Sequence, residues 1–340
     1  MILPTKATEP LAAHRMIAKA IQGRADAIDR ALLGHVWTVT EAGGVMGLAQ
    51  SPSGPASVAS RTMSFPGTLK GSPASEIAAW IEDWQPHRAT LGLAAANALI
   101  NGPDNELLQA AQPINPDPSM DSGVPAHLAV FHHFKAQLTG RKVVVIGRYP
   151  KLDSILDSSE VTVLERSPGG DDLPDPAAEV VLPEADWVFI TATSLINKTF
   201  SRLAQLADGA VTVLMGPSLP WLEGFKDFGI DYLAGVAPID PARAYDIAAE
   251  GGGTRLFGEG VGYRVADIGV ERMEALKAVI SSTADRRVAL KAKMEDWYAA
   301  GNTRRFPDYA ELERVSIRLS GMDTRYKRQW DARFGAEAMP

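Results

Sequence analysis

The sequence predicts an α/β protein in which a small α+β unit precedes a doubly wound parallel sheet and a helical extension follows it. The chain has 340 residues, more than the roughly 250 to 300 at which single hydrophobic cores stop growing. Five prolines fall between residues 103 and 125, a density typical of a connection. Beyond residue 126, predicted strands alternate with predicted helices, as in parallel sheets.

These observations divide the chain into four parts: a small α+β domain (1–102), a Pro-rich linker (103–125), a Rossmann-like domain (126–268) and a helical C-terminal extension (269–340). Apolar spacing in the first part predicts a helix over 9–33, a hairpin of strands 35–40 and 45–49, and helices over 74–84 and 86–100. In the third part we expect strands at 142–146, 161–164, 187–190, 211–215 and 232–236, and helices at 126–138, 196–206, 222–228 and 241–250.

Composition narrows the class of protein. The formal charge of -7 and a pI near 5.5 give no reason to expect nucleic acid or an anionic membrane as partner. Cysteine is absent, so a metal would be bound by His, Asp, Glu or backbone oxygen, or arrive inside a chelator. The chain has no run of about 20 apolar residues and no secretory cleavage pattern at its start. A soluble, cytoplasmic protein is therefore expected.

The extension is predicted to form a long helix over 270–297 and a second helix that ends in a basic, aromatic tail. Between residues 286 and 333 there are 12 Lys/Arg and 7 Asp/Glu, a local excess of +5. Because acids are interleaved with the basic residues, a solvated arm that packs on the body or on a second subunit is favoured over nucleic-acid binding. A homo-oligomer through these helices is thus one expectation.

The turns after the predicted strands are where an open parallel sheet binds ligands. The first strand runs into Gly147 and Arg148, without the further glycines of a dinucleotide turn. The next strand ends at Glu165, 18 residues beyond Gly147, where a Rossmann domain usually binds a ribose hydroxyl. A helix cap or a surface acid is the alternative interpretation of Glu165, and Arg148 could bind an anionic group.

Two later turns are rich in polar or rigid residues. The segment "ITATSLINKT" supplies Thr191, Thr193, Ser194 and Asn197, more hydroxyl and amide groups than one helix cap needs. The segment "LMGPSLP" places Gly216, Pro217 and Ser218 directly after a strand. Such a stiff turn either contacts a ligand or only ends the strand.

Outside these turns the sequence offers fewer candidate site residues. In the first domain, Glu41 lies at the predicted hairpin, and Asn97 and Asn101 share one face of a small, apolar helix. These amides either bond neighbouring backbone or line a pocket. No pair of histidines has the i, i+4 spacing of a helical zinc site, and no Gly-x-Ser-x-Gly, Walker or His-Glu motif is present.

Several segments in order, "GLAAANALIN", "LPEADWVFITATSLINKT", "GPSLP", "GIDYLAGV" and "EGGGTRLF", resemble the putative heavy-metal chelation domain family over about residues 11–265. The resemblance implies an enolase-N-terminal-like domain joined to a Rossmann-like domain, with a site in the cleft between them. It implies that eight residues line or shape this cleft, with Glu41 and Glu165 as acids: Asn97, Gly147, Thr191, Thr193, Asn197, Gly216, Pro217 and Ser218.

Two functions follow from this reading. The first is binding or handling of a metal ion or a metal chelate in the interdomain cleft. The second is an enzyme of undetermined reaction that binds a nucleotide-type or S-adenosylmethionine-like cofactor, with Glu165 as its main support. A third hypothesis assigns the function to the helical arm as an interaction element. The residues leave open the identity of any cofactor and whether a reaction is catalysed.

Overall fold

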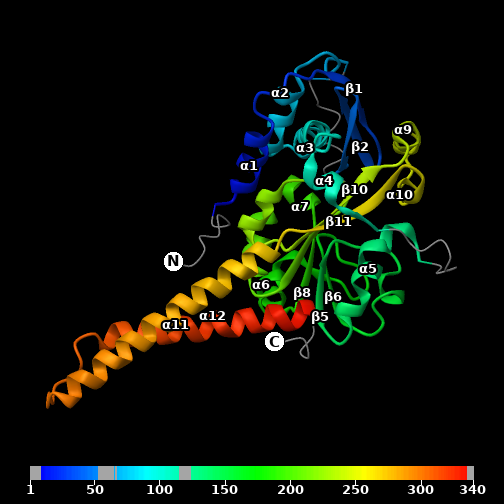
Figure 1. Ribbon diagram of the computed structural model, residues 1–340. Coiled ribbons are helices and arrows are strands. Elements are labelled where there is room, and N and C mark those ends of the chain that lie inside the picture. The colour runs from blue at the N-terminus through cyan, green and yellow to red at the C-terminus, as the bar shows by residue number, and fades with distance from the viewer. Residues whose placement is uncertain (1–8, 53–64, 66, 115–123, 335–340) are drawn as a thin grey trace.

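The computed structural model describes residues 9–52, 65, 67–114 and 124–334. Within these residues the chain forms a small antiparallel sheet with its helices, a large mixed sheet covered by helices, and a long two-helix hairpin that projects from the body (Figure 1). The mixed α/β architecture, with a mainly parallel sheet and C-terminal helices, confirms the predicted fold class.

The N-terminal unit begins with α1 (Ala12–Ala20) and a three-stranded sheet in the order β1-β2-β3. These strands span Ile28–Leu33, Trp37–Ala42 and Val45–Gln50, and both pairings are antiparallel. The prediction of one helix over 9–33 is wrong in its second half. Gly23 adopts a φ of +80° beyond the end of α1, a conformation that ends a helix easily, and the apolar residues that follow pair with β2 as β1.

Helices cover one face of this small sheet. They are α2 (Ala74–Ala78), the 3-10 turn η3 (Ala79–Glu82) and α3 (Pro86–Ile100), close to the two predicted helices. Almost every residue of α3 is buried. The helix approaches β3 so closely that a Cβ on Gly47 would lie 2.0 Å from the Ala94 carbonyl oxygen. Small residues on both elements permit this contact.

The large sheet has the strand order β4-β11-β10-β9-β8-β5-β6-β7. The five predicted strands are present as β5, β6, β8, β9 and β10, and all pairings among them are parallel. Strand β11 runs antiparallel beside β10, and the short β4 and β7 extend the two edges. The bounds are β4 Gln112–Pro113, β5 Lys142–Ile146, β6 Glu160–Glu165, β7 Leu173–Pro174, β8 Trp187–Thr191, β9 Val211–Met215, β10 Tyr232–Pro238 and β11 Val261–Asp267.

Helices and 3-10 turns connect these strands. Instead of one helix over 196–206, the chain forms α7 (Thr193–Ile196) and α8 (Phe200–Leu206), and Lys198 between them has a φ of +60°. The range predicted as a linker contains α4 (Glu106–Ala110) and β4. The remaining elements are η4 Ala126–Leu128, α5 Ala129–Leu138, η5 Leu152–Ser154, η6 Asp175–Ala177, α6 Ala178–Val181, η7 Leu182–Glu184, η8 Glu223–Phe228, α9 Pro241–Ala249 and α10 Leu256–Glu259.

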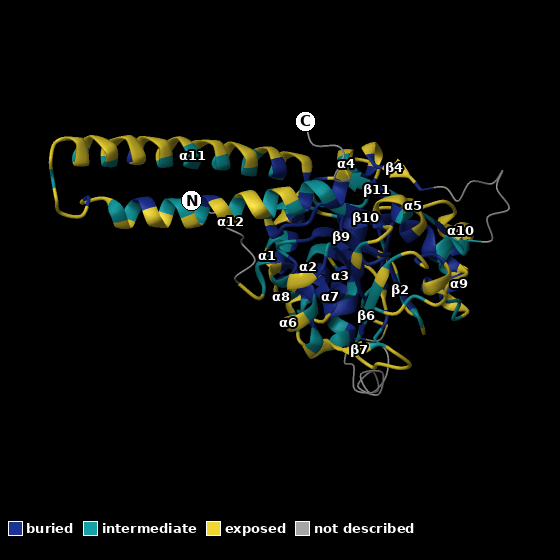
Figure 2. Ribbon diagram, turned by 90° about the horizontal axis from the view of Figure 1, so that it is seen from below, coloured by how far each residue is buried: buried dark blue, intermediate teal, exposed yellow. Residues whose placement is uncertain are grey.

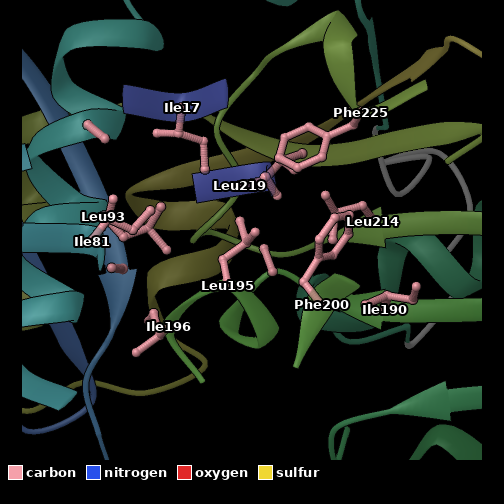
Figure 3. Packing of buried hydrophobic residues seen from close by; sticks show 14 of the residues in the cluster. Ile17, Ile81, Leu93, Ile190, Leu195, Ile196, Phe200, Leu214, Leu219 and Phe225 are labelled. Carbon is pink, nitrogen blue, oxygen red and sulfur yellow. The ribbon is translucent and has the colours of Figure 1, made fainter. Parts of the chain in front are cut away.

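A continuous hydrophobic core joins the N-terminal unit to one face of the large sheet. Figure 3 shows Ile17, Ile81 and Leu93 of the N-terminal unit beside Leu195, Ile196 and Phe200 of the α7–α8 region. A second cluster, which contains Phe131, Phe134 and Trp187, covers the opposite face. Burying one such large side chain contributes about 1.5–3 kcal/mol, so the shared core fixes the N-terminal unit against the sheet.

The C-terminal hairpin consists of α11 (Val270–Ala299) and α12 (Tyr309–Phe334). With a rise of 1.5 Å per residue, α11 is about 45 Å long. Figure 2 shows the outer part of the hairpin as mostly exposed or intermediate, with little of the body beside it. The predicted homo-oligomer through these helices, like the prediction of no nucleic-acid partner, stays a prediction. Among the described residues, no helix has the length and apolar character of a membrane span.

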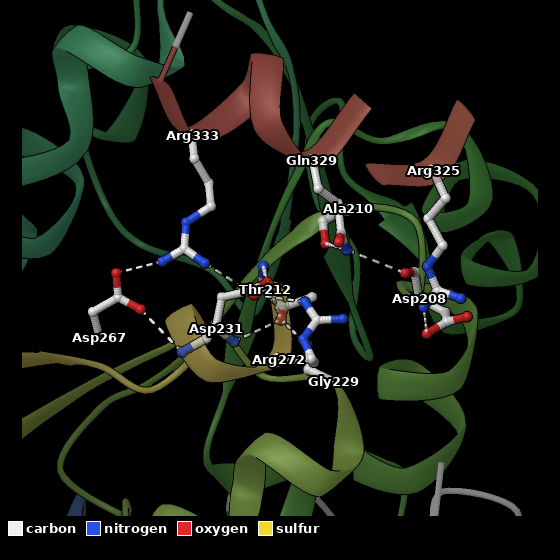
Figure 4. A network of polar contacts seen from close by, with 11 residues as sticks. Asp208, Ala210, Thr212, Gly229, Asp231, Asp267, Arg272, Arg325, Gln329 and Arg333 are labelled. Atoms are coloured by element: carbon white, nitrogen blue, oxygen red, sulfur yellow. Dashed lines mark hydrogen bonds and ion pairs between the residues drawn. The ribbon is translucent and has the colours of Figure 1, made fainter. Parts of the chain in front are cut away.

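Polar contacts fix the root of the hairpin to the body (Figure 4). The guanidinium of Arg333, at the end of α12, pairs with Asp231 at 3.4 Å and with Asp267. Arg272 from α11 donates to the same Asp231 at 2.5 Å, and the amide of Thr212 donates to Asp231 at 2.9 Å. The hairpin is therefore held at both of its helices.

Candidate functional site

A cavity of about 960 Å³ lies at the carboxyl ends of β5, β6, β8 and β9. Residues of the N-terminal unit, among them Trp37, Gln50 and Pro86, close its other side. In the sheet, β5 lies between β6 and β8. The chain passes from β5 to β6 on one side, then returns to β8 on the other side and continues outward to β9. This reversal of strand order is the position at which open α/β sheets bind ligands.

Two glycines shape the turns at this edge. Gly147 follows β5 with a φ of +103°, and Gly216 follows β9 with a φ of +110°. Other residues are strained at such angles. The Gly147 amide donates to the Leu164 carbonyl at 2.9 Å, which continues the pairing of β5 with β6 beyond the strand. Both glycines line the cavity, as does Pro217.

Glu165 and Arg148 also line the cavity, but their side chains are engaged by the protein. The Glu165 carboxylate accepts hydrogen bonds from the backbone amides of Arg148 at 3.0 Å and Arg166 at 2.8 Å. The Arg148 guanidinium donates to Asp172 and to the Gly169 carbonyl. Arg148 therefore stabilises the loop after β6 in this structure, and its predicted role with an anionic ligand would require it to leave Asp172.

A row of side-chain hydroxyls follows β8. The Oγ1 atoms of Thr191 and Thr193 are 2.7 Å apart and share a hydrogen bond. Ser194 is 1% exposed and lines the cavity, and its Oγ has no hydrogen-bond partner among the described residues. Asn197 is exposed at the end of α7 and also belongs to the lining. Because a buried hydroxyl without a partner costs free energy, Ser194 is an available hydrogen-bonding group for a ligand.

Ser218 connects the turn after β9 to the N-terminal unit. Its Oγ accepts a hydrogen bond at 2.9 Å from the backbone amide of Gln50, at the end of β3. Ser218 is 2% exposed and lines the cavity. The two sides of the cavity are thus bonded directly to each other at this point.

The structure does not bring Glu41 or Asn97 into the lining of the cavity. Glu41 forms a two-pronged ion pair with Arg30, and both N···O distances are 2.6 Å. Asn97 is fully buried and its amide donates to the Leu48 carbonyl at 2.7 Å. Both side chains stabilise the N-terminal unit. The bond of Asn97 to a backbone carbonyl matches one of the two alternatives that its sequence position left open.

Sequence reasoning missed the aromatic part of the lining. It comprises Trp37, His127, Tyr149, Phe257 and Tyr263. Burial raises the pKa of Tyr149 to about 12, opposed by a hydrogen bond with Thr191 and reinforced by the charge of Glu165. Burial likewise raises the pKa of Tyr263 well above its ordinary value. Both phenols therefore stay protonated at neutral pH.

Lys198 lies beside the cavity and was also missed. Its ammonium group donates to the Asp83 carbonyl and, at 3.1 Å, to the Ile196 carbonyl. Burial lowers its pKa to about 8, against the opposing charges of Asp83 and Glu82. These bonds link the break between α7 and α8 to the N-terminal unit. The left-handed backbone conformation of Lys198, a non-glycine residue, leaves no signal in the sequence.

The charged side chains of the cavity lining balance one another. The lining includes three arginines and three acids, Arg148, Arg166, Arg202, Glu165, Asp175 and Glu179. Arg166 pairs with Asp175 at 3.2 Å, and Arg202 pairs with Glu179 at 2.8 Å. Among the described residues of the lining, these charged groups therefore leave no net charge.

The described side chains show no cluster of three or more His, Asp or Glu arranged to hold a metal ion. The oxygen atoms of the lining instead follow several strand ends, and they include the hydroxyls of Thr191, Thr193 and Ser194 after β8. Hydroxyl groups bind the polar groups of an organic molecule well and are weak metal ligands when neutral.

The fold and the cavity define an α/β protein of two units with a ligand-sized site at the carboxyl edge of its sheet. Residues 14–100 and 129–267 match two family descriptions, both of putative heavy-metal chelation. Together these ranges cover about two thirds of the chain. The chain belongs to this putative heavy-metal chelation family, as its sequence segments indicated.

Solved structures of the same family have a similar fold. One is a protein of unknown function from Desulfitobacterium hafniense DCB-2, with a TM-score of 0.59 and 26% identity over 74% of this chain and 97% of that one. Another, from Pyrococcus horikoshii and also of unknown function, has a TM-score of 0.57 and 20% identity over 74% and 98%. At 20% identity the second comparison supports the fold alone.

A curated relative is more similar over a shorter range. An uncharacterized protein of Methanocaldococcus jannaschii is 36% identical over 114 residues, which are 31% of this chain and 43% of the relative. The match thus spans less than half of the relative's length. It supports common descent of that segment and carries no statement of activity.

Proposed function

We propose that this protein binds a metal ion that is already enclosed by a small organic chelator, in the cavity at the carboxyl edge of the large sheet. The observation that carries the proposal is the cavity itself. Its volume of about 960 Å³ is at the upper end of the range of small-molecule pockets, roughly 300 to 1,000 Å³, and far exceeds the space that a bare ion needs.

The chemistry of the wall supports a chelate more than a bare ion. Thr191, Thr193 and Ser194 offer neutral hydroxyls, and the charged residues at one end are paired with each other. A bare cation is held by several converging carboxylates or imidazoles. A chelate instead presents oxygen atoms that accept hydrogen bonds from hydroxyls. Its metal ion is ligated by the chelator and needs no direct protein ligand.

A second candidate is a nucleotide-type or S-adenosylmethionine-like cofactor. The observation in its favour is that Glu165 lies at the end of β6, next to β5, and lines the cavity. This is the position of the ribose-binding acid in Rossmann domains. In this protein, however, the backbone amides of Arg148 and Arg166 already occupy that carboxylate, so a ribose would share it with them.

Native mass spectrometry of gently purified protein, with elemental analysis of the same sample, tests the two candidates. We expect one co-purifying organic mass per chain together with a stoichiometric metal. Asn197→Trp should abolish both, because Asn197 is an exposed residue of the cavity wall and a bulky side chain there would take up ligand space. The matched control is Ser281→Trp, an exposed position on α11.

The outcomes separate the candidates. A metal-free mass of a nucleoside or sulfonium compound, lost on Glu165→Gln, would favour the second candidate. Metal that binds without any organic mass, with equal occupancy in Asn197→Trp and wild type, would contradict binding of a chelate in this cavity.

A further inference from the structure

One end of the cavity is built from aromatic side chains that come from four separate parts of the chain. Trp37 is on β2, Phe257 on α10 and Tyr263 on β11, and His127 is on η4. The rings of Phe257 and Tyr263 are stacked, with centroids 5.2 Å apart and an interplanar angle of 13°. Trp37 meets Phe257 edge-on at 5.9 Å. The rings thus form one continuous group and not isolated contacts.

Two of the ring nitrogens in this group are bonded to backbone carbonyls. The indole nitrogen of Trp37 donates to the Gly253 carbonyl at 3.0 Å. A ring nitrogen of His127 is 3.1 Å from the Pro150 carbonyl and donates to it. With its indole nitrogen bonded to the protein, Trp37 offers a ligand apolar ring surface, which suits contact with another flat ring.

The aromatic end and the polar end lie on opposite faces of the sheet. Trp37, Phe257 and Tyr263 belong to the hydrophobic cluster on the α5 face. Ile196 and Ala178, which line the other end, belong to the cluster shared with the N-terminal unit. The hydroxyls after β8 belong to the same lining. A ligand that fills the cavity would meet the rings, these hydroxyls and the paired charges.

We infer that the ligand carries a planar aromatic group, held against Trp37, Phe257 and Tyr263, and that it is an aromatic chelator such as a catechol. This inference rests on the proposed function, because it names the chemical class of the chelator. The metal-binding oxygens of the chelator would then face the hydroxyls of Thr191, Thr193 and Ser194. An aliphatic chelator would leave the aromatic end without a partner.

Isothermal titration with three probes tests the inference: the iron(III) complex of 2,3-dihydroxybenzoate, the iron(III) complex of citrate, and free 2,3-dihydroxybenzoate. Well-placed aromatic contacts add 0.5–1.5 kcal/mol each beyond area burial. We therefore expect the aromatic complex to bind about 10-fold more tightly than the citrate complex. Phe257→Leu should remove most of this advantage, and Phe257→Tyr should keep it.

The matched control is Trp84→Leu, since Trp84 is 72% exposed and lies outside the cavity lining. Trp84→Leu should leave the affinity for both iron complexes unchanged. Equal affinity for both iron complexes would overturn the aromatic inference and leave the proposed function intact. Binding of free dihydroxybenzoate without either iron complex would overturn the proposed function alone. If no probe binds, both are overturned.

Discussion

The root of the C-terminal hairpin and the charged part of the cavity both contain Arg–Asp ion pairs, but these pairs differ in their exposure to water. At the root, the side chains of Arg333 and Asp231 are 1% and 2% exposed. At the cavity, those of Arg166 and Asp175 are 53% and 46% exposed. Ion pairs of similar composition are thus sealed from water in one region and open to it in the other.

This difference indicates what each region does. A buried charge costs several kcal/mol to desolvate and is tolerated only when close partners of opposite charge compensate it. Arg333 accordingly contacts Asp231, Asp267 and the face of the Tyr232 ring. Exposed pairs can exchange partners at little cost. The root is therefore built to hold the hairpin in one position, whereas the exposed pairs of the cavity can rearrange their hydrogen bonds.

The largest effect is expected for Arg333→Ala. This change leaves Asp231 buried with one cation fewer and removes the ring contact with Tyr232. Breaking a buried ion pair costs roughly 3–5 kcal/mol, so the free energy of unfolding should fall by about 3 kcal/mol in urea titrations.

The control for this experiment is Arg286→Ala. Arg286 pairs with Glu311 at 2.6 Å in the outer hairpin, where the side chains are 49% and 36% exposed. Exposed pairs contribute about 0–1 kcal/mol. Equal losses in the two variants would show that burial does not distinguish the regions.

The two regions also differ in how far they could be predicted from sequence. The parallel strands and the polar turns after them were predicted because each is a local pattern, an apolar run followed by Gly, Thr or Ser. Arg333 and Asp231 are 102 positions apart, and the aromatic end of the cavity joins residues from 37 to 263. Neither leaves a local pattern.

Glu41 shows how one missed element displaces a site prediction. Because the second half of the predicted first helix is strand β1, Arg30 lies directly opposite Glu41 in the small sheet. The two side chains form an ion pair there. A carboxylate expected in the cleft is thereby held within the N-terminal unit, and only the pairing of β1 with β2 could have indicated it.

A smaller effect is expected from pH, through His14 on α1. Its side chain is fully buried, and Nε2 lies 2.7 Å from the Leu195 carbonyl of α7 and donates to it. Within the part of the chain described, Nδ1 has no partner. Burial lowers the pKa of His14, opposed by the bond to Leu195 and aided by the charge of Lys198.

Since the folded pKa of His14 lies below the unfolded value near 6.5, the unfolded state binds the proton more readily. Stability should then fall as pH drops below about 6.5. Urea titrations at pH 7.5 and 5.0 measure the loss, which His14→Gln should reduce. Burial also lowers the pKa of His133, so part of the dependence should persist in that variant. An unchanged pH dependence in His14→Gln would refute the assignment.

The smallest effect on stability is expected for Ser194→Ala, within about 0.5 kcal/mol of wild type, because its hydroxyl has no partner to lose among the described residues. The same change should weaken binding of the iron(III)–dihydroxybenzoate complex about 5-fold, the loss of one ordinary hydrogen bond. Ser201→Ala is the matched control. Ser201 is equally buried on α8 but donates to the Pro10 carbonyl at 3.0 Å, so it should lose about 1 kcal/mol of stability with no loss of binding. If the two serines behaved alike in both measurements, the unpartnered hydroxyl of Ser194 would not mark the binding site.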